Sequence, residues 1–480
     1  MALVSSNLTS GFIDLATYDE LEKYMYGVGS DATAYFVRAT RRSTWFTQVP
    51  VVLSRASGHP SFGQEWSVSV SRAGDYLLNT WLRVTVPALF ASEAQDSKRD
   101  GRDVTIDTHI AYTPNFMHNL IREACITFND LVAARFDNFH LDFWSAFSTP
   151  AGKQLGYLNM VGMTDDLIHP RKSLPSKVLN LPLPFFYSRD SGVSLPTAAL
   201  PYNDMRIQFS FRHWNELLVA YDHITFKDSN ETTILARAAT AGDFTSTPEL
   251  NNCQVWANYA LVSNDERKRM ACAPREILIE QVQTAPVQSF NPFQNHQQSF
   301  DVRFSHAIKA IFFAVRNSTV SSSWSNYTTE ENHASASESG LSIENFFPGS
   351  DPVAETSLIY ENTQRLASMG SDYYSLVAPY YHAPVIPVYN GYHMYSYALD
   401  MMSVDPTGST NWGKLTNVSI IPNASVDAKA RSEPKNGKLV AQEGSTALKH
   451  ERPQTFQFVV SAVNNNVIRI SGGALGFPVL

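Results

Sequence analysis

The sequence predicts an all-β protein that contains two copies of one sandwich or barrel domain. Segments such as EWSVSVS (65–71), MRIQFSF (205–211) and FQFVVSAV (456–463) are rich in β-branched and aromatic residues, and many alternate apolar with polar positions. Twenty-three glycines and 25 prolines separate these segments, and long helical periodicity is scarce. Because 480 residues exceed one ordinary core, more than one domain is expected.

The two copies are indicated by four short matches that recur in the same order at offsets of 230–234 residues. The matches are FTQV (46–49) with IEQV (279–282), SVSVSRA (67–73) with DVRFSHA (301–307), CITFND (125–130) with SLIYEN (357–362), and DFWS (142–145) with DYYS (372–375). A short charged helix is expected at 264–270, close to the boundary between the copies. We therefore predict an N-terminal arm over 1–30, one domain over 31–270 and a second over 271–480.

The matches also align segments with weak strand signals, which we interpret as inserted loops at equivalent places. Residues 87–115 correspond to 318–355, and residues 212–252 correspond to 427–453.

The composition narrows the class of protein. The net charge of −8 argues against nucleic-acid binding, which needs a basic face. Charged residues make up 17% of the chain, against about 25% in a typical soluble domain. A chain so poor in charge is expected to hide much of its surface against partners.

The sequence also bears on membranes, secretion and redox state. The longest apolar run, AIFFAV (310–315), is far too short to span a membrane, and no signal peptide is expected at the N-terminus. Three cysteines indicate a reducing compartment, and we expect them to be small buried side chains. Six N-x-[ST] sequons are expected to stay unmodified without a secretory signal: Asn7, Asn230, Asn317, Asn326, Asn417 and Asn423.

A search for catalytic and metal-binding patterns finds no convincing one. No H-E-x-x-H, zinc-spaced Cys/His pair, G-x-S-x-G or phosphate-binding loop is present. SRDSG (188–192), DPTGSTN (405–411) and SGGALG (471–476) are better explained as turns. We therefore predict no enzymatic activity, cofactor or metal.

Both ends of the chain carry apolar residues whose packing partners the sequence does not identify. In ATYDELEKYMYG (16–27), Thr17 and Glu20 predict a capping box at the start of an amphipathic helix. The apolar stripe of this helix consists of Tyr18, Leu21 and Met25. The chain ends on Phe477, Pro478, Val479 and Leu480, which we expect to cover a sheet edge or to dock on a neighbouring molecule.

Several long segments resemble the major capsid proteins of iridoviruses, nearest to those of invertebrate iridescent viruses. They include SGFIDLATYDELEKYMYG (10–27), SRAGDYLLNTWLRV (71–84), MHNLIREACITFNDLVAARFD (117–137), SNDERKRM (263–270), RFSHAIKAIFFAVRN (303–317) and NNNVIRISGGALGFPVL (464–480). The resemblance covers almost the whole chain and weakens in 88–110, 227–250, 318–352 and 427–452.

The resemblance implies a fold and an assembly. Each copy would be an eight-stranded jelly roll, and three chains would form a homotrimeric capsomer with a pseudo-hexagonal outline. Capsomers would contact one another and tile an icosahedral virion shell around an internal membrane and double-stranded DNA. The inserted loops would form outer towers, and the N-terminal arm would face minor capsid proteins and the membrane. Assembly would take place in the host cytoplasm, without direct contact to nucleic acid.

One alternative keeps the fold and changes the function. A lectin or attachment protein would bind host-surface glycans through its outer loops, with Trp324 and Tyr327 as stacking residues. A glycan-cleaving enzyme would need a facing pair of carboxylates, which the sequence does not offer.

Overall fold

The computed structural model describes residues 12–13, 16–17, 19–21, 23, 44–99, 101–295, 297–330, 349–434, 439–441, 448–450 and 452–477. The chain divides into two compact units, Met1–Trp45 and Phe46–Leu480. In the first unit, Thr17 N donates a hydrogen bond to Ile13 O, and Lys23 N donates one to Asp19 O, as in helical turns. All sheets of the described residues lie in the second unit.

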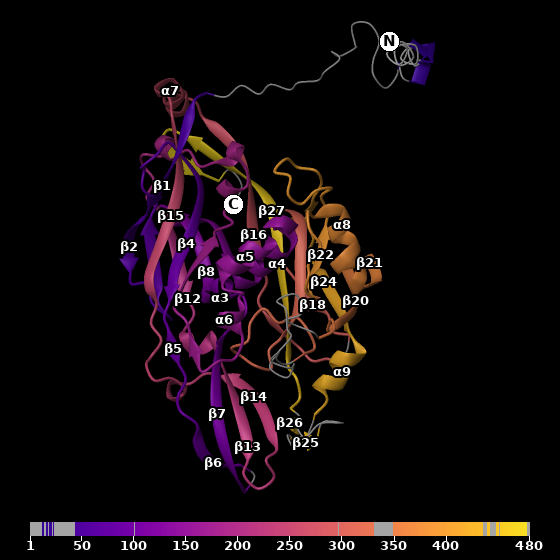
Figure 1. Cartoon of the computed structure of the whole chain (residues 1–480). Coiled ribbons are helices and arrows are strands. Elements are labelled where there is room, and N and C mark those ends of the chain that lie inside the picture. Colours follow the sequence, from indigo (N-terminus) through magenta and orange to yellow (C-terminus); the bar gives the residue numbers. More distant parts are fainter. Residues whose placement is uncertain are drawn as a thin grey trace, which may run out of the picture. The chain divides into compact units, whose positions relative to one another are not determined.

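Nine of the described strands between Phe46 and Val262 form two antiparallel sheets that face each other (Figure 1). One has the order β1-β15-β4-β11, and the other has the order β2-β3-β12-β8-β9. Their bounds are β1 Phe46–Val52, β2 Ser54–Gly58, β3 Glu65–Ser69, β4 Tyr76–Val86, β8 Ile121–Phe128, β9 Leu131–Asp137, β11 Lys177–Pro182, β12 Met205–Phe211 and β15 Asn251–Val262.

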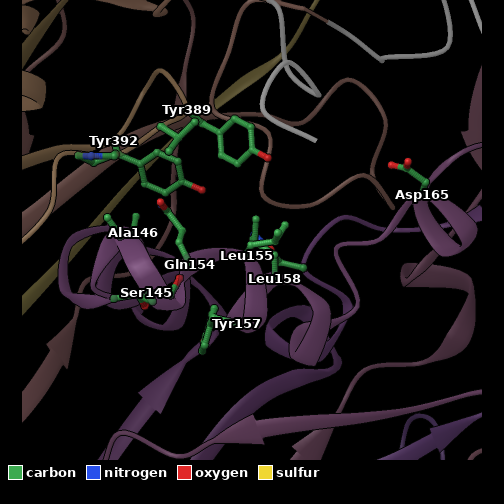
Figure 2. Close-up of a pocket in the computed structure, with 14 residues that line it drawn as sticks. Ser145, Ala146, Gln154, Leu155, Tyr157, Leu158, Asp165, Tyr389 and Tyr392 are labelled. Atoms are coloured by element: carbon green, nitrogen blue, oxygen red, sulfur yellow. The ribbon is translucent and has the colours of Figure 1, made fainter. Parts of the chain in front are cut away.

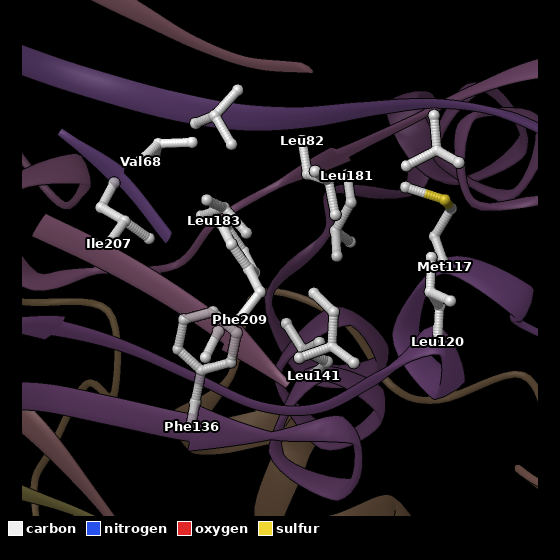
Figure 3. Close-up of a cluster of buried hydrophobic side chains, with 14 of the residues drawn as sticks. Val68, Leu82, Met117, Leu120, Phe136, Leu141, Leu181, Leu183, Ile207 and Phe209 are labelled. Carbon is white, nitrogen blue, oxygen red and sulfur yellow. The ribbon is translucent and has the colours of Figure 1, made fainter. Parts of the chain in front are cut away.

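The core of this half lies between the two sheets because each strand buries alternate side chains. In β12, for example, every second residue from Met205 to Phe211 is fully buried. Ile207 and Phe209 from this strand pack in one hydrophobic cluster with Leu82 and Leu181 from the other sheet (Figure 3). The first half is therefore a two-layer β-sandwich.

The second half repeats this strand order. One sheet has the order β16-β27-β19-β22, and the other has the order β18-β24-β20-β21. Each half is thus a jelly roll, as predicted. The bounds are β16 Arg275–Thr284, β17 Gln288–Phe290, β18 Phe300–Asp301, β19 Ala307–Asn317, β20 Val353–Tyr360, β21 Thr363–Gly370, β22 His393–Ser396, β23 Thr410–Asn411, β24 Val418–Ala424, β27 Phe456–Ser471 and β28 Ala474–Gly476.

The sequence matches fall on equivalent elements of the two jelly rolls. FTQV and IEQV lie in β1 and β16, and CITFND and SLIYEN lie at the ends of β8 and β20. The last two residues of this pair form the same two-residue turn. Asn129 and Asp130 have φ of 49° and 65°, and Glu361 and Asn362 have φ of 45° and 64°, as type I′ hairpins require. The two copies therefore share the backbone conformation of this turn as well as their strand order.

Two segments that the sequence analysis treated as loops form a further sheet instead. Residues 87–115 and 212–252 contribute four antiparallel strands in the order β14-β13-β7-β6. In Figure 1 this sheet lies at the end of the second unit away from α7. The strands of this sheet are β6 Gln95–Arg99, β7 Arg102–Tyr112, β13 Leu218–Phe226 and β14 Thr232–Ala238. Two short strand pairs lie outside the larger sheets. They are β5 Leu89–Phe90 with β10 Ser173–Leu174, and β25 Leu439–Ala441 with β26 Leu448–His450.

Helices connect the strands. The charged helix expected at 264–270 is confirmed as α7, whereas α4 and α5 were not predicted. No helix within the described ranges is long and apolar enough to cross a membrane. The α-helices are α3 Phe116–Leu120, α4 Asn138–Ser148, α5 Ala151–Val161, α6 Asp165–Ile168, α7 Asn264–Cys272, α8 Ala378–His382 and α9 Val426–Ser432, and a π-helix, η8 Tyr373–Val377, precedes α8 directly. Single 3-10 turns are η2 Phe186–Ser188, η3 Ser191–Val193, η4 Thr197–Ala199, η5 Trp214–Glu216, η6 Ala241–Asp243 and η9 Trp412–Lys414.

Candidate functional site

The two jelly rolls meet along α4, which follows β9 of the first jelly roll directly. Asp137 caps this helix, because its Oδ1 accepts a hydrogen bond from His140 N at 2.9 Å. Phe139, Phe143 and Phe147 then recur every fourth residue and share one face. This face packs on the outer side of the second jelly roll, against Ala310, Phe312, Ala314, Val459 and Val463 of β19 and β27.

Aromatic stacking orders this junction. The ring of Phe312 lies 6.1 Å from that of Phe143 and 5.4 Å from that of Phe147, measured between centroids, and both pairs are stacked. Such pairs contribute about 0.5–1.5 kcal/mol beyond the area that they bury. The junction is therefore an apolar core of its own.

A buried polar network lies beside the stacked rings, with Asp142 of α4 at its centre. His118 Nδ1 lies 2.7 Å from Asp142 Oδ1. Ser325 Oγ and Tyr327 OH, from the second jelly roll, donate to Asp142 Oδ2 at 2.7 and 2.8 Å. The Tyr157 hydroxyl lies 2.6 Å from His118 Nε2. Burial raises the pKa of Tyr157 and Tyr327, and the nearby carboxylate adds to the effect.

The geometry of this network fits a structural role. The side chains of His118 and Asp142 are buried away from solvent. Ser325 donates its hydroxyl proton to the carboxylate and not to the histidine, which is not the order of a nucleophile and its base. A satisfied buried carboxylate that bridges two domains fixes their relative position, because breaking it leaves a buried charge unpaired.

An ion pair holds the junction at a second place. Glu280 of β16 lies between Arg189 of the first jelly roll and Lys309 of β19, with Arg189 Nε 3.0 Å from Glu280 Oε2. The side chains of Glu280 and Lys309 are buried, and that of Arg189 is 9% exposed. The Arg189 guanidinium also lies 3.4 Å from the ring centroid of Trp144 in α4. Burial lowers the pKa of Arg189, and the charge of Glu280 opposes this effect.

The residues suggested for glycan stacking belong to the junction, so that assignment is wrong. Tyr327 is buried, and the Trp324 indole donates from Nε1 to Glu216 O at 2.8 Å. The guanidinium groups of Arg212 and Arg316 lie 4.1 and 3.6 Å from the Trp324 ring centroid. Burial lowers the pKa of both guanidinium groups to about 10. The Trp324 ring is thus occupied by cations of its own chain.

A cleft of about 870 Å³ opens at the rim of the junction. Figure 2 shows Tyr389 and Tyr392 of the second jelly roll across this cleft from Leu155 and Leu158 of α5. Among the described residues of the lining, Asp165 is the one carboxylate, and tyrosines and apolar side chains make up much of the rest. No cluster of three His, Cys, Asp or Glu side chains suited to a metal occurs in the described part of the chain.

Two groups of large apolar side chains are among those that remain exposed in the second unit. One group lies on β1, β11 and nearby loops, and the other lies on η8, α8 and the segment that follows. The groups consist of Phe46, Val49, Val52, Val178 and Tyr202, and of Leu376, Val377, Tyr380, Tyr381, Ile386, Val388 and Leu399. Exposed apolar surface of this extent is typical of protein–protein contact.

The C-terminal segment folds back on its own chain. Gly472 and Gly473, with φ of 61° and 82°, form the turn between β27 and β28, as SGGALG predicted. Leu475 N then donates to Asn203 Oδ1 at 3.1 Å. Phe477 is half-buried against the hydrophobic cluster of the first jelly roll. Pro478, Val479 and Leu480 lie outside the described residues.

The residues of the N-terminal stripe, the sequon asparagines and the cysteines differ in how exposed they are. Leu21 is exposed, whereas Tyr18, Met25 and Asn7 lie outside the described residues. Asn230 and Asn417 are exposed, and Asn423 is half-buried. Asn317 and Asn326 are buried and donate hydrogen bonds within the chain. The three cysteines are free thiols; Cys125 is buried and Cys253 half-buried, but Cys272 is exposed, so the expectation of burial is wrong for Cys272.

Comparison with known proteins shows to which family the chain belongs. Residues 34–262 match the family described as major capsid protein N-terminus, and residues 266–476 match large eukaryotic DNA virus major capsid protein. The major capsid protein of Invertebrate iridescent virus 6 is 55% identical over 488 aligned residues, which cover 100% of both chains. That of Lymphocystis disease virus 1 is 47% identical with the same coverage. This chain belongs to the major capsid protein family of large DNA viruses.

Solved structures agree on the fold of this capsid protein. A quasi-atomic model of the PBCV-1 virus capsid superposes with a TM-score of 0.68 at 19% identity, over 93% of this chain and 100% of that one. The Faustovirus major capsid protein gives 0.68 at 11% identity, over 95% of each chain. The capsid protein is thus a structural subunit of the virion shell that assembles with copies of itself, and its family is not a class of enzymes.

Proposed function

We propose that three copies of this capsid protein form a pseudo-hexagonal capsomer, and that these capsomers tile an icosahedral shell around an internal membrane and double-stranded DNA. The proposal rests on one observation: a single chain carries two jelly rolls of the same strand order, joined side by side. Three such chains supply six similar domains, which suit a position surrounded by six neighbours. The exposed apolar side chains of both jelly rolls provide surface for these contacts.

The proposal assigns a separate role to each part of the chain. Residues 31–270 and 271–480 are the two jelly rolls, and the arm of 1–30 faces minor capsid proteins and the membrane on the inner side. The sheet of β6, β7, β13 and β14 belongs to an outer tower, since the insertions that form it extend from one end of the second unit (Figure 1). Assembly in the host cytoplasm is supported by three cysteines that remain free thiols.

The C-terminal segment receives a role within the subunit. The contacts of Leu475 and Phe477 with the first jelly roll support a tail that closes the junction of its own chain. We therefore propose that Leu475 and Phe477 reinforce this junction and are not the main contact between subunits.

Size exclusion with light scattering tests the proposal on the full-length protein. One chain has a mass of 53.5 kDa, so three chains give about 160 kDa. A stable species near 160 kDa is the expected result. A protein that stays at 53.5 kDa at every concentration and salt condition, with and without the minor capsid proteins, contradicts the trimer.

A further inference from the structure

The junction inside one chain shows how two of these jelly rolls bind each other. The helix that follows β9, α4, lies on the outer face of β19 and β27 in the second jelly roll. Beside it, the free edge of β16 meets β9, where Gln281 Nε2 donates to Ala133 O at 2.6 Å. One jelly roll thus contributes a helix and an edge strand, and the other contributes a sheet face.

The second jelly roll carries the equivalent helix, and this helix has no jelly roll on it. It follows β21 as α4 follows β9, and DYYS (372–375) is the match of DFWS (142–145). Whereas α4 buries its apolar face, Tyr380 and Tyr381 are 70% and 72% exposed, and Leu376 is 52% exposed. The segment η8–α8 therefore presents an apolar face that remains uncovered in the single chain.

The first jelly roll carries the equivalent sheet face. By register, Val52 of β1 lies opposite Trp256 of β15, Trp256 opposite Trp81 of β4, and Trp81 opposite Pro182 of β11. These four residues form one apolar row across the outer face of the sheet. The two tryptophan rings stack with centroids 6.1 Å apart, and all four side chains are at least partly exposed. This row corresponds to the face on which α4 lies in the second jelly roll.

Both surfaces are poor in charge. The strands β1, β4, β11 and β15 contain no aspartate or glutamate, and their charged residues are Arg83 and Lys177, of which Lys177 is paired with Asp166 at 3.1 Å. The segment 371–382, which contains η8 and α8, has no lysine or arginine and one acid, Asp372. An aromatic centre with few charges around it is typical of a protein–protein interface.

We infer that η8–α8 of one subunit docks on the outer face of β1-β15-β4-β11 of the next subunit and repeats between chains the contact that α4 makes within one chain. The partner is a second copy because α8 and β1 lie on opposite flanks of the second unit (Figure 1). Each copy offers one helix and one sheet face, so the contact is head-to-tail, and in the proposed trimer it closes after three copies. The inference rests on the proposed trimer and names its interface.

Site-specific photo-cross-linking tests the pairing on the full-length capsid protein. A benzoylphenylalanine probe replaces Tyr381 in one variant and Val52 in another, and a third carries it at Val426 of α9, an 82% exposed apolar control. Irradiation is expected to join two chains of 53.5 kDa into a product of about 107 kDa for the first two variants and not for the control. Mass spectrometry should map the Tyr381 probe to β1, β4, β11 or β15, and the Val52 probe to 371–382.

The outcomes separate this inference from the proposed trimer. A protein of about 160 kDa whose probes join other regions, or residues 1–45, refutes the pairing and leaves the trimer intact. A protein that is monomeric throughout refutes both. As a second measure, Tyr380→Asp with Tyr381→Asp is expected to lower the trimer fraction at least tenfold, whereas Val426→Asp leaves it unchanged. An unchanged trimer fraction in the double variant also refutes the pairing.

Discussion

Replacing Phe143 by alanine should loosen the junction between the two jelly rolls. The ring is fully buried, and its centroid lies 6.1 Å from Phe312, 5.9 Å from Tyr327 and 6.2 Å from Tyr392. A buried phenylalanine removes about 150–250 Å² from water, worth roughly 4–6 kcal/mol at about 25 cal/mol per Å². Measured losses for Phe→Ala are about 3–5 kcal/mol, and we expect a loss in this range because three rings lose a partner.

Hydrogen exchange with mass spectrometry measures this loss locally and does not require the whole subunit to unfold in one step. A loss of about 3–5 kcal/mol lowers protection of amides in α4 and β19 by roughly two to three and a half orders of magnitude. The matched control is Leu155→Ala on the adjacent helix α5, where the side chain is 64% exposed and the expected change is below about 0.5 kcal/mol. If Phe143→Ala lowered protection in α4 and β19 no more than the control does, the stacked rings would not hold the junction.

Three further predictions follow from burial and backbone geometry. Burial lowers the pKa of His140 to about 3, so its contribution to stability is present above pH 6.5 and is lost as the pH falls toward 3; His140→Gln should flatten this part of a pH series of melting temperatures, and an unchanged slope would contradict it. A thiol reagent should modify exposed Cys272 within minutes and Cys125 only after unfolding, because burial raises the Cys125 pKa to about 11; equal rates would argue against the packing. Gly391→Ala should lower the melting temperature by several degrees, because φ is 91° and a Cβ would lie 2.1 Å from Tyr327 O; a wild-type melting temperature would refute this close approach.

Strand type and the duplication were predictable because both depend on local pattern. Alternation of apolar and polar residues marks a half-buried strand within a few residues, as in MRIQFSF. The match of CITFND with SLIYEN identified equivalent strands, and its last two residues form the same turn in both copies. The sheet of β6, β7, β13 and β14 was missed because its two hairpins, β6–β7 and β13–β14, are joined by the pairing of β7 with β13. That pairing links residues more than 100 positions apart, and no local signal carries it.

The junction residues were missed for a related reason. Lys309 and Arg316 flank AIFFAV and resemble the charged ends of an apolar run, yet both are buried. A sequence-level signal for α4 existed in the spacing of Phe139, Phe143 and Phe147, which follows a helical and not a strand period. For Asp142 no such signal existed, since its partners come from segments that lie 24 and more than 180 residues away.

The sequence by itself determined the fold class, the number of similar domains, the scarcity of surface charge and, through resemblance along the chain, the capsid family. These properties are sums over many residues, so local errors average out. Only the tertiary structure decided which side chains join the jelly rolls and which apolar faces stay open. Burial depends on what packs on a residue, and that partner is set by contacts between distant segments. Trp324 shows the difference: in the sequence it marks an exposed loop, and in the folded chain it lies against Arg212 and Arg316.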